Sequence, residues 1–140
     1  MSRKIFLRTL GGLSVLFLVL SCAHLGTGPD PKAELRKRVA AGWQAMVDGN
    51  CAALYDMTTA AFRQTMSRKE FSTLCNKNIE SFEIADIGLV GEPPKEADVT
   101  VRYRMTFRSF PFDLEAKQYW VWESGGWFLD PVRTATPMSQ

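Results

Sequence analysis

The sequence predicts one α+β domain, in which N-terminal helices pack on a bent, four-stranded antiparallel sheet. Two observations predict this class. Up to residue 75 apolar residues recur every three or four positions, as on one face of a helix, whereas from residue 82 onward they alternate with polar ones, as in half-buried strands. Helices followed by strands joined through short turns are the order of an α+β fold. A chain of 140 residues suits a single domain.

Asp30-Pro31 predicts the start of the first helix, with Asp30 as the N-cap and Pro31 in the first turn. The apolar stripe of this helix consists of Leu35, Val39, Trp43, Met46 and Val47. Gly49-Asn50 ends it.

Three shorter helical segments are expected next. One runs from Cys51 to Met57 with Asn50 as its cap, and another opens at Thr58 or Thr59 and reaches Phe62. Ser67 to Glu70 matches a capping box. The helix that it opens is expected to turn three apolar residues to one side, namely Phe71, Leu74 and Cys75.

The first strand is expected from Phe82 to Val90, with a bulge near Ala85–Asp86 where the apolar positions change phase. A polar loop follows at 92–95. A long strand is expected over 99–108, because its apolar residues alternate strictly with threonines and arginines.

A turn at Ser109-Phe110 leads into a third strand, whose inward positions are Phe112, Leu114, Ala116, Gln118, Trp120 and Trp122. The expected register pairs Phe107 with Phe112 and places Arg104 opposite Glu115. Ser124-Gly125-Gly126 turns the chain into a short last strand over 127–129, and residues 134–140 form a polar tail that we expect to fray.

The N-terminus has the parts of an export signal. Arg3, Lys4 and Arg8 precede an apolar stretch from Leu10 to Leu20, which is too short for a permanent membrane span. The closing sequence Val-Leu-Ser-Cys at 19–22 resembles the lipobox of bacterial lipoproteins. That resemblance implies cleavage after residue 21, lipid attachment to Cys22, and a flexible tether over 22–30. A plain secretory signal or an uncleaved anchor are the alternatives.

Residue 23 is alanine, not the aspartate that in lipoproteins often retains the chain at the inner membrane. The resemblance therefore favours the outer membrane of the cell envelope, facing the periplasm. Three of the 17 basic residues lie in the segment to be removed, so the mature chain has 14 against 15 acidic residues. This balance gives no reason to expect nucleic-acid binding.

Residues 31–133 resemble the nuclear transport factor 2-like superfamily, a cystatin-like α+β cone. The resemblance rests on the element order, on the break at 49–55 (GNCAALY), and on the closing segment 122–129 (WESGGWFL). These motifs are structural and imply no catalysis. Another helix-on-sheet arrangement is the alternative fold.

Export to an oxidising periplasm makes a disulfide between the two remaining cysteines, Cys51 and Cys75, the expected pairing. Two buried free thiols are the alternative. The sole histidine, His24, lies in the tether, so imidazole catalysis and multi-histidine metal sites are not expected. No cofactor is predicted.

The candidate pocket residues inside the cone are Trp43, Tyr55, Tyr103, Gln118 and Trp120. Gln118 is the strongest polar indication, because a buried amide needs a partner or a ligand. Core packing is the simpler interpretation of the aromatic residues. Arg102, Arg104 and Arg108 are expected to form a solvated charge ladder.

The favoured function is non-catalytic binding of a partner protein or a small apolar ligand by a lipid-anchored envelope protein. Two alternatives remain. One is an isomerase or cyclase that uses an acid in the cone, for which Asp56 and Asp86 are the candidates beside the tyrosines. The other is a structural subunit of an envelope complex.

Overall fold

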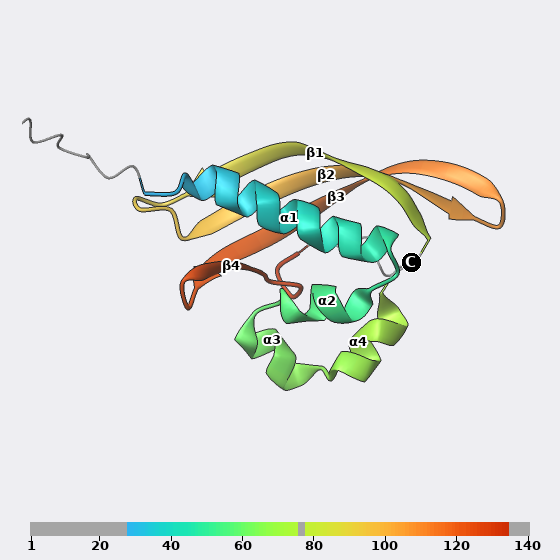
Figure 1. Ribbon diagram of the computed structural model, residues 1–140, viewed down its shortest axis with the longest axis horizontal. Helices are drawn as coiled ribbons and strands as arrows, with labels where there is room; N and C mark the ends of the chain where they lie inside the picture. The colour runs from blue at the N-terminus through green and yellow to red at the C-terminus, as the bar shows by residue number, and fades with distance from the viewer. Residues whose placement is uncertain (1–27, 76–77, 135–140) are drawn as a thin grey trace, which may run out of the picture.

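The computed structural model describes residues 28–75 and 78–134 (Figure 1). The predicted signal over 1–21, Cys22, most of the tether and residues 135–140 of the tail lie outside the described residues. None of the described helices is both long and apolar enough to span a membrane.

Four helices form the first half of the domain: α1 (Pro31–Val47), α2 (Cys51–Asp56), α3 (Ala60–Thr65) and α4 (Arg68–Leu74). The predicted N-caps Asp30, Asn50 and Thr59 each accept a backbone N–H, and Ser67 with Glu70 forms the complete capping box. The expectation for Leu74 is wrong. Phe71 and Cys75 are buried, but Leu74 is 62% exposed because it ends α4 on the solvent side.

Four antiparallel strands follow in the order β1-β2-β3-β4: β1 (Ile79–Val90), β2 (Glu96–Phe107), β3 (Phe110–Glu123) and β4 (Gly126–Leu129). The register between β1 and β2 shifts between Ile84 and Asp86, which confirms the predicted bulge.

The predicted register of the β2–β3 hairpin is wrong by two residues. Phe107 pairs with Phe110 rather than Phe112, because Arg108 and Ser109 both adopt positive φ (49° and 69°) and close the hairpin in two residues. Arg104 consequently lies opposite Asp113, not Glu115. Side chains alternate with a period of two, so each residue keeps its predicted face.

The core lies between α1 and the inner face of the sheet (Figure 1). Leu35, Val39 and Trp43 of α1 are almost fully buried. Figure 1 also shows that the β2–β3 hairpin extends past the end of α1. The helix therefore covers only part of the inner face.

Candidate functional site

The centre of the cone is closed by two tryptophans and one glutamine. Trp43 of α1 and Trp120 of β3 both donate their indole N–H to Oε1 of Gln118, at 3.2 Å each. The amide that the sequence singled out thus accepts two hydrogen bonds from the domain's own core. Trp120 is 1% exposed and Trp43 3%.

A small cavity of about 90 Å³ remains beside this network. Trp43, Tyr103 and Gln118 line it, together with apolar residues of the helices and strands. Cavities that hold drug-sized ligands measure roughly 300–1,000 Å³. The described lining contains no carboxylate and no imidazole. Burial raises the pKa of the Tyr103 hydroxyl, and the Trp43 and Tyr103 rings lie 5.0 Å apart between centroids.

The other candidates lie outside this cavity. The hydroxyl of Tyr55 donates to the backbone carbonyl of Met66 at 2.8 Å, which fixes the α3–α4 connection. Asp56 is an exposed partner of Arg68, and Asp86 is exposed on β1. The structure therefore brings together Trp43, Tyr103, Gln118 and Trp120, but neither Tyr55 nor the two aspartates.

Cys51 and Cys75 form a disulfide with a Cα–Cα distance of 6.0 Å, as the sequence predicted. It joins the start of α2 to the end of α4 and is buried. Within the described stretches, no three His, Cys, Asp or Glu side chains gather as metal ligands would.

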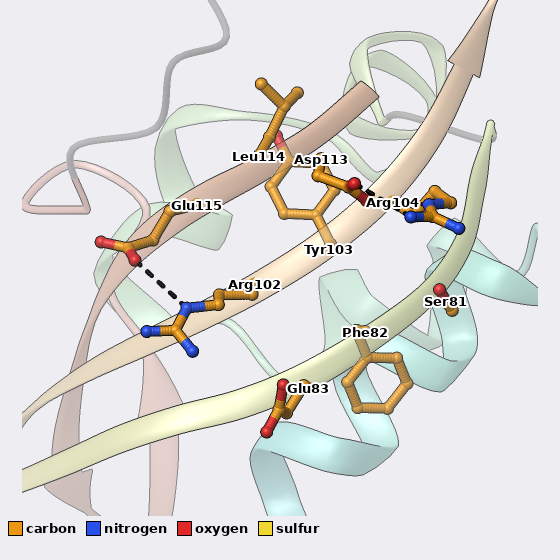
Figure 2. A pocket seen from close by; sticks show the side chains of 9 residues that line it. All are labelled: Ser81, Phe82, Glu83, Arg102, Tyr103, Arg104, Asp113, Leu114 and Glu115. Carbon is orange, nitrogen blue, oxygen red and sulfur yellow. Dashed lines mark hydrogen bonds and ion pairs between the residues drawn. The ribbon is translucent and has the colours of Figure 1, made fainter. Parts of the chain in front are cut away.

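The face of the sheet that points away from α1 carries charged side chains around a shallow hollow of about 580 Å³ (Figure 2). The lining also includes Phe82, Tyr103 and Leu114, whose positions in the strands alternate with those of the charged residues. Arg104 donates two hydrogen bonds to Asp113, at 2.8 and 2.9 Å, and Arg102 lies 3.7 Å from Glu115. The hydrogen bond from Arg104 lowers the pKa of the Asp113 carboxyl. Arg102 and Arg104 each have an acidic partner across the hairpin, as the predicted solvated ladder requires. Arg108 does not belong to it, because it lies in the hairpin turn with its guanidinium over the Phe107 ring. Glu83 also lines the hollow, and no ion pair is found for it among the described residues.

The most unusual surface lies on the opposite face of the same hairpin. Here three cross-strand pairs follow one another toward the tip, and we call these six residues the apolar hairpin face: Tyr103 with Leu114, Met105 with Phe112, and Phe107 with Phe110. Their exposed fractions reach 40% for Leu114, 46% for Phe112, 54% for Phe107 and 68% for Phe110.

Burial along this face decreases toward the tip of the hairpin. Tyr103 and Met105 are half-buried, and Tyr103 still packs on Trp43 of α1, whereas the other four residues are exposed. The three preceding pairs on the same face are all buried: Ala97 with Trp120, Val99 with Gln118, and Val101 with Ala116. Monomeric proteins rarely expose large contiguous apolar patches, and those that exist often bind partners. The alternation in the sequence identified these residues as inward-facing but contained no indication that they would be uncovered.

Solved structures share the fold. One of them is a nuclear transport factor 2-like protein of unknown function from Shewanella oneidensis, with 11% sequence identity and a TM-score of 0.50, covering 71% of this chain and 94% of that one. Another is a SEC-C motif containing protein from Rhodopseudomonas palustris, with 13% identity and a TM-score of 0.53, covering 71% and 74%. No protein-family model and no curated protein matches the sequence. The predicted α+β, nuclear transport factor 2-like fold is confirmed, and at these identities the likeness concerns the fold alone.

Proposed function

We propose that the protein is a lipid-anchored docking protein of the cell envelope, which binds an envelope protein through the apolar hairpin face and performs no catalysis. The observation that carries this proposal is the contrast between a filled cone and an uncovered apolar hairpin. Phe107, Phe110 and Phe112 are each about half exposed or more.

The state of the cone argues against the ligand and enzyme alternatives. A cavity of about 90 Å³ has room for only a few water molecules, since each occupies about 30 Å³ in the liquid. Gln118 already accepts from two indoles, and an isomerase or cyclase would need an acid or base that the described lining does not supply.

The anchor rests on the lipobox-like sequence at 19–22 and on the disulfide. Disulfides persist in oxidising compartments such as the periplasm and are rare in the cytosol. The bond between Cys51 and Cys75 therefore supports export, which the apolar segment from Leu10 to Leu20 also predicts.

The anchor is tested by Cys22→Ala. Lipid attachment and cleavage both require this cysteine, so the variant should leave the membrane fraction or accumulate as the uncut precursor. Cell fractionation and mass spectrometry of the purified chain measure both. A variant that still fractionates with the outer membrane at mature size would contradict lipidation at Cys22.

The docking surface is tested with the double variant Phe110→Ser, Phe112→Ser in the intact lipoprotein. After crosslinking in cells and purification from membranes, a partner retained by the wild type should be lost. Leu74→Ser, Val132→Ser is the matched control, because these two residues are also exposed, at 62% and 78%, but lie elsewhere.

Two results would contradict the proposal. The same partner could be recovered with both double variants, or the purified wild type could form a dimer by itself that only the hairpin variant disrupts. Sedimentation of the purified chain distinguishes a second copy from another envelope protein.

A further inference from the structure

A second groove lies between α1 and the β3–β4 hairpin and has a volume of about 450 Å³. Its lining includes three charged residues of α1 and three aromatic residues of the strands: Glu34, Lys37, Arg38, Trp122, Trp127 and Phe128. We call it the α1–β4 groove. It shares no residue with the apolar hairpin face or with the cavity in the cone.

Positive charge gathers at this end of α1. Its first turns contain four basic residues, namely Lys32, Arg36, Lys37 and Arg38. The same segment contains two acidic residues, Asp30 and Glu34. The ion pairs found among the described residues involve Arg68, Arg102, Arg104 and Arg133, and none involves these four. Two of these cations, Lys37 and Arg38, line the groove beside one acid, Glu34, and neither cation is held in an ion pair with a carboxylate of the described chain.

Two buried donors of groove residues lack an acceptor. Arg38 Nε and Trp127 Nε1 form no hydrogen bond within the part of the chain that the structure describes. The Arg38 guanidinium lies over the Phe128 ring, 5.5 Å from its centroid, so its position is set by packing. A buried donor without an acceptor is costly, and each such group calls for a partner. Both donor atoms are buried, so the groups that can meet an anion in the groove are the exposed Lys37 ammonium and the remaining N–H groups of the Arg38 guanidinium. These match an anion with several acceptor oxygens.

The short distance in sequence between Cys22 and the groove indicates which anion lies near the groove. Asp30 lies eight positions after Cys22, and a fully extended segment of that length spans at most about 29 Å. Arg38 lies eight residues further along α1, or about 12 Å along the helix axis. If Cys22 carries lipid, the groove is thus within reach of the membrane surface.

We infer that the α1–β4 groove binds the phosphate of an anionic phospholipid headgroup, so that the anchored domain rests on the membrane through the N-terminal end of α1. Basic residues next to a membrane anchor are attracted to anionic lipids. The inference rests on the proposed anchor for its orientation. It also explains why the apolar hairpin face, at the other end of α1 (Figure 1), stays accessible to a partner.

The test uses the mature chain 22–140 with Cys22→Ser, which cannot be acylated and retains every described residue and therefore every described contact. It is sedimented with vesicles of phosphatidylcholine, with or without about 30% phosphatidylglycerol. Binding is expected only with phosphatidylglycerol and should fall as salt screens the charges. Lys37→Gln, Arg38→Gln should weaken binding by about fivefold or more.

The control variant Lys69→Gln, Arg108→Gln removes the same charge from exposed positions outside the groove and should bind as the wild type does. If the double groove variant unfolds, the single variant Lys37→Glu, at an exposed position, replaces it and should likewise weaken binding. Equal binding to pure phosphatidylcholine, or equal losses in groove and control variants, would overturn the inference. Because this chain carries no lipid, either result leaves the test of Cys22 unaffected.

Discussion

Trp43 and Gln118 lie 75 residues apart in the sequence, yet the indole N–H of one donates to the side-chain oxygen of the other at 3.2 Å in the core. This bond ties α1 to β3. Since Trp120 donates to the same oxygen, a single amide satisfies two buried indoles. That explains why a polar residue occupies the inward face of β3.

Gln118→Leu should therefore destabilise the domain more than the small change in side-chain volume suggests. It leaves two buried N–H groups without an acceptor, and we expect a loss of about 2–4 kcal/mol in the free energy of unfolding. Urea unfolding followed by tryptophan fluorescence measures it. Trp43→Phe should lower the free energy of unfolding less in the Gln118→Leu variant than in the wild type, because there it removes an indole N–H that has already lost its acceptor. A loss below about 0.5 kcal/mol for Gln118→Leu would contradict the network.

The disulfide should make a large contribution to stability. In the chain-entropy model, a crosslink between residues 24 positions apart contributes about 3 kcal/mol. Cys51→Ala, Cys75→Ala should lower the melting temperature, and a reducing agent should lower that of the wild type. The number of free thiols in denatured, unreduced protein checks the bond directly. Free thiols at both Cys51 and Cys75, with an unchanged melting temperature on reduction, would exclude it.

The hydrogen bond from Arg104 should be visible in the titration of Asp113. That bond lowers the Asp113 pKa, so Arg104→Gln should raise it toward the ordinary value for an aspartate. The pair stabilises the folded domain at neutral pH, and this stabilisation is lost as the pH falls through the lowered pKa of Asp113. NMR titration of the carboxyl carbons measures the shift. If the pKa of Asp113 stays low in Arg104→Gln, a group other than Arg104 is responsible for the shift.

The faces of the strands could be predicted although the register of β2 and β3 could not. Alternation fixes the face of a residue, and an error of two positions leaves it unchanged. The tight turn was missed because Arg108 and Ser109 take positive φ without glycine, which a sequence pattern does not indicate.

The exposure of the hairpin depends on the relative lengths of two elements. The 17 residues of α1 span about 25 Å, whereas the 12 residues of β2 span about 40 Å. The strand extends beyond the helix that covers it, so Met105 and Phe107 continue the apolar alternation into an uncovered region. The α1–β4 groove had no sequence signal either, because Arg38 and Trp127 come to line one groove only when β4 packs beside α1.

The most direct test of the docking account is photo-crosslinking in living cells, with a photoreactive amino acid in place of Phe110 on the apolar hairpin face. Lys117, an exposed residue further along β3 on the charged face, is the control position. We expect one discrete crosslinked species with a second envelope protein from position 110 and none from 117. If position 110 gives no crosslink, or both positions give the same products, the apolar hairpin face is not a docking site.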